Sequence, residues 1–193
     1  MSLKEKIESK KAKIAIVGLG YVGLPLAIEF VRGGFEVHGI DVDSEKVSGL
    51  NGGRSHVLDV PDEAVRSAVE AGKLFAHDNY DPIRQADCVS ICVPTPLKKT
   101  RDPDISFITG AVEQIVPRLH PDMLVVLEST TYPGTTDELV RAEIEKAGFE
   151  VGKDIFVCFS PERVDPGNRM FQTRNTPKDV SYTHLTLPTN REV

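Results

Sequence analysis

The sequence contains no tryptophan and only three cysteines among its 193 residues. The cysteines are Cys88, Cys92 and Cys158, and so sparse and odd-numbered a set inside apolar runs does not form a disulfide framework. It is typical of reduced thiols, so we expect a cytoplasmic protein. Cys88 and Cys92 are four residues apart, but no second pair of cysteines or histidines stands near them. We therefore expect no metal site.

The chain also lacks a long apolar run and an excess of basic residues. No apolar stretch reaches the roughly 18 to 20 residues that cross a bilayer, and the charged residues 1–12 contain no hydrophobic core of a secretory signal. The 23 Lys and Arg residues against 29 Asp and Glu residues give a formal net charge of −6. This balance disfavours nucleic acid and anionic membranes as partners.

Short apolar runs alternate with helical patterns from residue 13 to residue 159. The apolar runs predict strands at 13–18, 35–41, 74–76, 87–93, 123–127 and 155–159. The patterns with helical spacing predict helices at 21–32, 44–50, 61–71, 104–119 and 135–147, and a helical turn at 81–85. This alternation predicts an α/β fold, a Rossmann-type doubly wound parallel sheet with helices on both faces.

A glycine-rich turn joins the first predicted strand to the first predicted helix. Residues 18–23 form a GxGxxG motif, and its place between a strand and a helix gives the motif its meaning. Gly18 permits a tight turn, Gly20 lets the backbone approach a diphosphate, and Gly23 lets the helix pack closely on the strand. The free N–H groups of the helix start attract the phosphates. The residues that we assign to the cofactor here are Gly18, Gly20, Tyr21, Val22 and Gly23.

Asp41 ends the second predicted strand, 18 residues after Gly23. A carboxylate there accepts hydrogen bonds from ribose hydroxyls and repels a 2′-phosphate, so the expected cofactor is NAD and not NADP. The alternative is a glycine turn kept for packing beside a solvated aspartate. Lys46, five residues further on, is either a contact of the adenosine and its phosphates or a solvated helix lysine.

Two of the segments that follow predicted strands carry hydroxyl groups. Doubly wound sheets bind ligands beyond the carboxyl ends of their strands, so such segments are candidate site residues. Two prolines flank Thr95 and expose its hydroxyl. Residues 128–136 hold a cluster of hydroxyls that includes Thr130, and helix capping by Thr135 or Thr136 would explain this cluster only in part.

A third such segment, residues 160–168, contains Glu162 and Arg163. A glutamate at a strand end beside a crevice can act as a general base or orient a water molecule. The alternative is a surface carboxylate of Glu162 paired with Arg163.

Four segments resemble, in sequence and in order, the UDP-sugar 6-dehydrogenase family: GLGYVGLPLA, ICVPTPL, LESTTYPGTT and SPERVDPGN. The resemblance covers about residues 11–178. The variants STTYPGTT and ERVDPGN are most similar to the UDP-N-acetylglucosamine 6-dehydrogenases, followed by the UDP-N-acetylmannosamine dehydrogenases, and UDP-glucose dehydrogenases belong to the same family. The resemblance implies a homodimer that oxidises the C6 alcohol of a UDP-sugar to a carboxylate with two NAD, in the synthesis of polysaccharide precursors.

The resemblance also implies roles for individual residues. Thr95 and Thr130 would contact NAD near the ribose and nicotinamide, and Thr130 would also help to hold a catalytic water. Glu162 would assist that water in hydrolysing a thioester on a catalytic cysteine. Arg163 would face the nucleotide sugar, and Lys46 would contact the adenosine side of the cofactor.

The later half of the family has no counterpart in this chain. That half supplies the nucleophilic cysteine, the central dimer helix and the UDP-sugar domain, and none of the three cysteines here matches the nucleophile, so we expect this chain alone to be inactive. We divide the chain into a charged extension (1–12), an NAD-binding domain (13–178) and a tail (179–193). The tail breaks with the family pattern and shows no helix or strand pattern, and we interpret it as non-native or disordered. The alternatives to this function are a non-catalytic NAD-binding domain and another β-hydroxyacid-type dehydrogenase.

Overall fold

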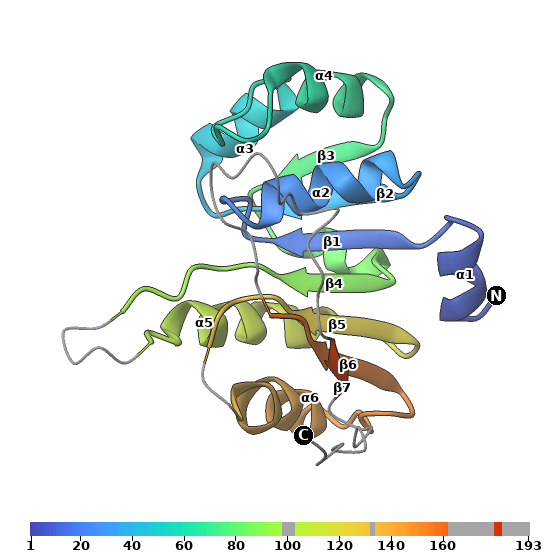
Figure 1. Cartoon of the computed structure of the whole chain (residues 1–193). Helices are drawn as coiled ribbons and strands as arrows, with labels where there is room; N and C mark the ends of the chain where they lie inside the picture. Colours follow the sequence, from blue (N-terminus) through green and yellow to red (C-terminus); the bar gives the residue numbers. More distant parts are fainter. Residues whose placement is uncertain (98–102, 132–133, 162–179, 183–193) are drawn as a thin grey trace, which may run out of the picture.

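A seven-stranded sheet forms the centre of the protein. The computed structural model describes residues 1–97, 103–131, 134–161 and 180–182. The strand order is β3-β2-β1-β4-β5-β6-β7, with β1 to β6 parallel and β7 antiparallel (Figure 1). The strands are β1 (Lys13–Val17), β2 (Glu36–Ile40), β3 (Leu74–His77), β4 (Cys88–Ile91), β5 (Met123–Leu127), β6 (Ile155–Phe159) and β7 (Ser181–Tyr182).

Helices connect the parallel strands, which confirms the predicted Rossmann-type fold. The α-helices are α1 (Leu3–Glu8), α2 (Gly23–Arg32), α3 (Ser44–Asn51), α4 (Asp62–Glu70), α5 (Ser106–Ile115) and α6 (Ala142–Lys146). Further helical segments are the 3₁₀-helices η1 (Asp81–Gln85) and η2 (Val116–Arg118) and the π-helix η3 (Thr136–Arg141). The elements β5, β6 and η1 have the predicted bounds, whereas α2 begins two residues later than predicted. None of the helices in the described ranges has both the length and the apolar character that a bilayer crossing requires.

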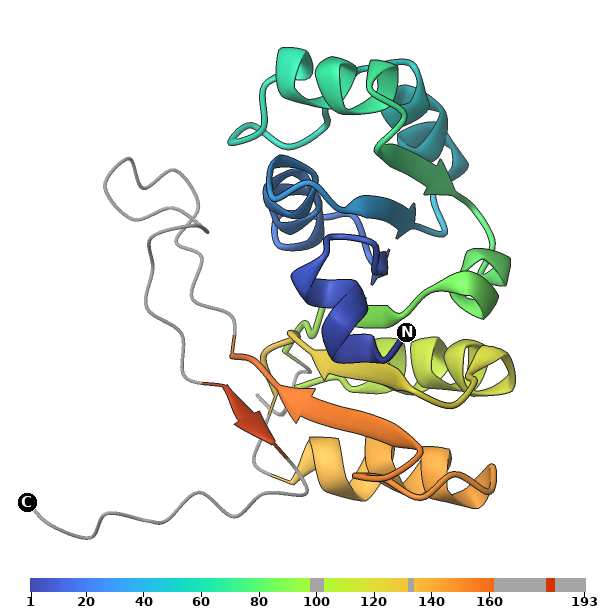
Figure 2. The same cartoon turned by 90° about the vertical axis from the view of Figure 1, so that its right-hand side faces the viewer.

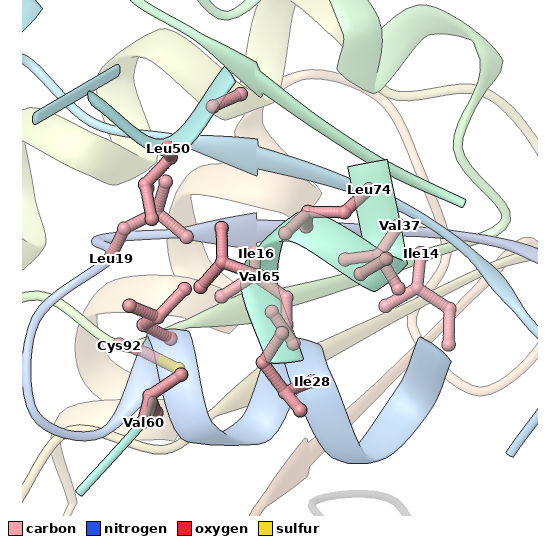
Figure 3. Close-up of a cluster of buried hydrophobic side chains, with 14 of the residues drawn as sticks. Ile14, Ile16, Leu19, Ile28, Val37, Leu50, Val60, Val65, Leu74 and Cys92 are labelled. Carbon is pink, nitrogen blue, oxygen red and sulfur yellow. The ribbon is translucent and has the colours of Figure 1, made fainter. Parts of the chain in front are cut away.

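The apolar side chains of β1 alternate between the two faces of the sheet, as a strand buried on both faces requires. Ile16 belongs to a cluster with Ile28 of α2 and Val65 of α4 (Figure 3). Val17, which points to the opposite face, belongs to a second cluster with Ile108 of α5. Helices α2 and α4 therefore cover one face of the sheet, and α5 covers the other.

The charged extension at residues 1–12 contains the helix α1, which was not predicted from the sequence. A capping box starts it: the Ser2 hydroxyl accepts a hydrogen bond from the Glu5 N–H at 3.3 Å, and the Glu5 carboxylate accepts one from the Ser2 N–H at 2.8 Å. Leu3 is buried, and its N–H donates to Asp122 Oδ2 at 2.9 Å. Helix α1 is thus part of the folded domain and lies at the amino-terminal end of the strands (Figure 1).

Asp87 joins α1 to the sheet. It is buried directly before β4, where Oδ1 accepts a hydrogen bond from the Lys6 ammonium and Oδ2 accepts one from the Lys13 N–H at 2.8 Å. The hydrogen bond to Asp87 raises the pKa of Lys6 above its ordinary value. One carboxylate therefore holds α1, the start of β1 and the start of β4 together.

Two predicted helices differ from the structure in their last or first turn. The helix predicted at 104–119 ends as an α-helix at Ile115, and Pro117 lies in the 3₁₀-helix η2 because proline has no N–H for the α-helical hydrogen bond. The helix predicted at 135–147 begins as the π-helix η3 and continues as α6. A π-helical turn accommodates extra residues that an apolar spacing of 3.6 does not reveal.

The structure corrects the expectation that the tail carries no strand. Ser181 and Tyr182 pair antiparallel with Phe159 and Cys158 of β6 (Figure 2). Without β7, the strand β6 would form the edge of the sheet, and its free backbone groups can pair with any short extended segment. Residues 183–193 lie outside the described residues, so the interpretation of the tail as non-native stays a prediction.

Asp87→Ala should lower the free energy of unfolding by about 2–3 kcal/mol, because the Lys13 N–H and the Lys6 ammonium both lose their acceptor. Urea denaturation followed by circular dichroism measures this loss. Glu63→Ala is the matched control, since Glu63 forms an exposed ion pair with Arg66 and its removal should cost about 0.5 kcal/mol or less. Equal losses in the two variants would contradict the anchoring role of Asp87.

Candidate functional site

The carboxyl ends of the parallel strands stand level with one another. The register pairs Val17 with Ile40 and Ile91, then Ile91 with Leu127, and Leu127 with Phe159. The strand order reverses between β1 and β4, which is where doubly wound sheets open a crevice for ligands. A cavity of about 1080 Å³ lies beyond these strand ends.

This cavity brings together the predicted cofactor residues, with one exception. The predicted residues that line it are Gly18, Gly20, Tyr21, Val22, Asp41, Lys46, Thr95 and Thr130. Gly23 does not line the cavity and instead packs against the end of β1. Glu162 and Arg163 lie outside the described residues, so their roles stay predictions.

Two glycines of the glycine-rich turn are required by the fold itself. Gly18 has a φ of +92°, and a Cβ on it would lie 2.7 Å from the carbonyl oxygen of Cys92. A Cβ on Gly23 would lie 1.8 Å from the carbonyl oxygen of Gly18. Helix α2 can therefore start this close to the end of β1 only with a glycine at position 23.

No atom in the described part of the chain requires a glycine at position 20. A Cβ on Gly20 would meet no atom within 4 Å, and its backbone does not have the positive φ that favours glycine. Gly20 lines the cavity, so a side chain there would take up space that a ligand could use. A diphosphate that must approach the backbone closely explains this glycine, and the residues present therefore fit a dinucleotide.

The start of α2 offers hydrogen-bond donors to such a diphosphate. Val22 precedes the helix, and no side chain caps it there. The free N–H groups and the dipole of a helix start attract anions. Tyr21 and Val22 line the cavity beside these donors. The expected place for the diphosphate is therefore between Gly20 and the first turn of α2.

The backbone of one residue in the glycine-rich turn is held from two sides. The Leu19 N–H donates to Asp41 Oδ2 at 2.9 Å, and the Leu19 carbonyl is 2.7 Å from His56 Nε2. A carbonyl can only accept, so His56 carries a proton on Nε2. Asp41 Oδ1 accepts a further hydrogen bond from the Asp43 N–H at 3.0 Å. A carboxylate has about four acceptor positions, which leaves Asp41 able to accept from ribose hydroxyls as well.

His56 was not predicted from the sequence because no motif marks it. The residue lies in the loop between α3 and α4, far along the chain from the glycine-rich turn that it contacts. Lys46 of α3 lines the same cavity, with its Nζ 3.7 Å from Asp43 Oδ2 and its side chain half-exposed. This position is compatible with both interpretations of Lys46, an adenosine contact or a solvated lysine.

Across the sheet from Asp41, hydroxyl groups join the loops after β4 and β5. Thr95 Oγ1 donates to the Thr130 carbonyl at 2.6 Å, and Ser129 Oγ donates to the Val93 carbonyl at 2.7 Å. The Thr95 hydroxyl, which we predicted to be exposed, thus uses its proton within the protein and offers a ligand its lone pairs. The Thr130 residue itself is exposed.

The hydroxyl cluster does not cap the following helix. Thr135 precedes η3, but its side chain makes no capping hydrogen bond. Its Oγ1 instead lies 2.7 Å from Thr131 Oγ1, and both Thr135 and Thr136 are buried. Thr135 therefore holds residue 131 against the start of η3.

Two of the three thiols are deactivated by their surroundings. Burial, with the nearby charge of Asp87, raises the pKa of Cys88 to about 12, and burial, with the charge of Glu128, raises the pKa of Cys158 to about 11. Such thiols are protonated near neutral pH and are poor nucleophiles. Cys92 lies directly after β4 and not within a strand as predicted, and it is buried at the cavity wall. In the part of the chain that the structure describes, no group of His, Cys, Asp and Glu side chains could hold a metal ion.

The chain is similar to nucleotide-sugar dehydrogenases. The NAD binding domain of the UDP-glucose/GDP-mannose dehydrogenase family matches residues 12–181. The UDP-N-acetyl-D-mannosamine dehydrogenase of Pyrococcus horikoshii is 37% identical over 161 residues, which are 83% of this chain and 38% of that protein. The UDP-N-acetyl-D-glucosamine 6-dehydrogenase of Salmonella typhi is 36% identical over 172 residues, which are 89% of this chain and 40% of that protein.

A solved structure shares the fold. The NDP-N-acetyl-D-galactosaminuronic acid dehydrogenase from Methanosarcina mazei Go1 superposes with a TM-score of 0.80 at 30% identity, over 94% of this chain and 42% of that one. The chain therefore spans about 40% of the length of the relatives that it matches. Both UDP-N-acetylhexosamine branches that the sequence motifs indicated are among these relatives.

Gly20→Ala and Gly23→Ala should affect different properties of the protein. Gly20→Ala should weaken NAD binding about tenfold or more and leave the free energy of unfolding within about 1 kcal/mol, because its Cβ meets only cavity space. Gly23→Ala should lower the free energy of unfolding by about 2 kcal/mol, because its Cβ meets the Gly18 carbonyl. Calorimetric titration and thermal unfolding measure the two effects. A Gly20→Ala protein that binds NAD like the unmodified chain would refute the assignment of Gly20.

Proposed function

Because the chain belongs to the UDP-glucose/GDP-mannose dehydrogenase family through its NAD binding domain, we propose that it is the cofactor-binding part of a nucleotide-sugar 6-dehydrogenase. The proposed reaction oxidises the C6 alcohol of a UDP-N-acetylhexosamine to a uronate in two NAD-dependent steps, in the synthesis of polysaccharide precursors. The observation that carries the cofactor assignment is Gly20, whose missing Cβ leaves space at the cavity wall that no atom of the protein fills.

When it is bound, NAD supplies the acceptor for the hydride. The residues of this chain bind and orient it: the Gly20 backbone and the start of α2 take the diphosphate, and Asp41 takes the ribose hydroxyls. Asp41 and His56 hold the Leu19 backbone in place, so the turn needs little rearrangement on binding. Thr95 and Thr130, which a hydrogen bond joins, are proposed to contact the nicotinamide half.

The oxidation of an alcohol to a carboxylate also needs a nucleophile and a water molecule. We propose that Thr130 helps to hold the water, that Glu162 assists its attack on a thioester, and that Arg163 faces the nucleotide sugar. The raised pKa values of Cys88 and Cys158 make both unsuitable as the nucleophile. Cys92 does not match the family's nucleophile either, so we propose that the nucleophilic cysteine lies in a part of the protein that this chain does not span. This chain alone should therefore turn over no substrate.

Two relatives support the choice of substrate class. They are named for UDP-N-acetyl-D-mannosamine and UDP-N-acetyl-D-glucosamine, which favours a UDP-N-acetylhexosamine, with UDP-glucose as the alternative. We expect the full-length protein to form a homodimer and to act in the cytoplasm, since its cysteines are free thiols. With a formal net charge of −6, the chain is expected to bind neither nucleic acid nor an anionic membrane.

Titration with NAD and NADP, followed by thermal unfolding, tests this proposal. NAD at about 100 times its Kd should stabilise the chain by about 2.7 kcal/mol, whereas NADP at the same concentration should give a much smaller effect. Asp41→Ala should weaken NAD binding and remove most of the preference over NADP, because the carboxylate that repels the 2′-phosphate is gone. Glu70→Ala, which removes an exposed carboxylate outside the cavity, is the control and should keep the preference.

Two outcomes of this titration would contradict the proposal. Equal stabilisation by NAD and NADP would refute the assignment of Asp41, and no stabilisation by NAD in a chain that still unfolds cooperatively would refute the cofactor site. Formation of NADH when UDP-sugar and NAD are added to the chain would refute its proposed lack of turnover.

A further inference from the structure

The face of β2 and β3 that points away from α2 and α4 carries a pair of histidines. Val37 and Leu74 of these strands point to the other face, into the apolar cluster that Figure 3 shows. The alternate residues point away from that cluster: His38 of β2 pairs in register with Phe75 of β3, and His77 ends β3. Phe75 is exposed, and both histidines are partly buried. None of these five side chains lines the cofactor cavity.

A hydrogen bond joins the two histidine rings. His38 Nδ1 lies 3.1 Å from His77 Nε2, and His38 Nε2 lies 3.0 Å from Glu36 Oε1. The Lys13 ammonium of β1 lies 2.9 Å from the same Glu36 oxygen. The His38 ring also stacks on Phe75, with ring centroids 5.3 Å apart. These side chains therefore connect β2 to both of its neighbours in the sheet.

Glu36 determines the direction of these hydrogen bonds. The hydrogen bonds from Lys13 and His38 lower the pKa of Glu36, so its carboxylate is charged and can only accept. His38 therefore carries a proton on Nε2, and the Nδ1 atom of a neutral His38 ring is an acceptor. The donor between the two rings is then His77 Nε2.

The hydrogen bond between the rings can survive one added proton but not two. A single added proton on either ring still leaves one donor and one acceptor between His38 and His77. A second proton makes both rings donors, so two N–H groups and two positive charges meet across 3.1 Å. The charged groups around the pair are Glu36, Lys13 and Asp78, which directly follows β3. Burial lowers the pKa of His77, the charge of His38 lowers it further, and Asp78 acts in the opposite direction.

The backbone of His77 holds the backbone of Asp41. The Asp41 N–H donates to the His77 carbonyl at 3.0 Å, and His77 pairs with Ile40 as the last residue of β3. Strand β3 has four residues and forms an edge of the sheet (Figure 1). The end of such a strand frays unless side chains hold it. The His77 ring, held by His38, therefore fixes the backbone from which the Asp41 carboxylate reaches the glycine-rich turn.

We propose that His77 is a positioning residue for Asp41, and that acid weakens cofactor binding by breaking the His38–His77 hydrogen bond. This inference rests on the proposed function, because Asp41 is the proposed contact of the ribose. With at most one added proton on the pair, β3 stays paired with β2 to its last residue and Asp41 is in place. When both rings are protonated, their repulsion separates the end of β3 from β2 and displaces Asp41.

NAD binding by the unmodified chain should weaken about fivefold between pH 7.5 and pH 5.5 in calorimetric titration. His77→Gln should remove most of this pH dependence, because a glutamine amide can donate to His38 Nδ1 in place of the ring and does not titrate. Its affinity at pH 7.5 should stay within about twofold of that of the unmodified chain. His77→Leu, which has no donor, should bind NAD about fivefold more weakly already at pH 7.5 and lose little more at pH 5.5.

His120→Gln is the matched control for the loss of a titrating ring. His120 precedes β5, at the opposite end of the sheet from Asp41, and its Nδ1 lies 2.9 Å from the Pro121 carbonyl. This variant should keep the full pH dependence of NAD binding.

Thermal unfolding without NAD tests the histidine pair independently of the cofactor. Because the folded chain holds the pKa of His77 below its ordinary value, the unfolded chain binds more protons, and stability is lost as the pH falls below about 6.5. Between pH 7.5 and pH 5.5, the melting temperature of the unmodified chain should therefore fall by about 2–4 °C more than that of His77→Gln.

The two measurements distinguish failure of this inference from failure of the proposed function. The same pH dependence of NAD affinity in His77→Gln and in the unmodified chain would overturn the positioning role of His77, even where their melting temperatures differ as expected. Equal shifts of the two melting temperatures would overturn the two-proton limit of the histidine pair. Absence of NAD binding by the unmodified chain at pH 7.5 would overturn the proposed function, and the role of His77 with it.

Discussion

The contact between the start of α2 and the end of β1 is the constraint on which the cofactor site depends. Helix α2 can approach the Gly18 carbonyl only because Gly23 has no side chain, and this approach places the helix start beside the cavity. Hydrogen bonds from the Leu19 N–H to Asp41 and from His56 to the Leu19 carbonyl then fix the turn between strand and helix. The binding surface is thus held by the fold before any ligand arrives, which limits the entropy lost on binding.

Because the carboxyl ends of the parallel strands are aligned, segments far apart in the sequence meet at one site. Gly20, Asp41, Thr95 and Thr130 follow four different strands, and the parallel register brings them to one cavity. These residues differ in whether they stabilise the fold, contact the proposed ligand, or do both. Asp41 serves both, since it orients the glycine-rich turn and can accept from a ribose. No described contact requires that Gly20 lack a Cβ, which supports its proposed role as a contact of the ligand.

The sequence predicted the features that rest on local patterns and missed those that rest on contacts between distant segments. Strand alternation gave the parallel fold, and the bounds of β5 and β6 followed directly from their apolar runs. Helix α1 has a local signal in the Ser2–Glu5 capping box, but its packing on the domain depends on Asp87 and Asp122, which lie far along the chain. His56 was missed because its contact also joins distant segments. The π-helix η3 and the strand β7 could not be predicted, since the first breaks the helical period and the second depends on a free sheet edge.

A crystal structure of the chain with NAD bound is the most direct test of this cofactor site. We expect that the diphosphate lies against Gly20 and the first turn of α2 and that the ribose hydroxyls donate to Asp41. A dinucleotide whose nicotinamide end lies at Asp41, or whose diphosphate makes no contact with the glycine-rich turn, would contradict it.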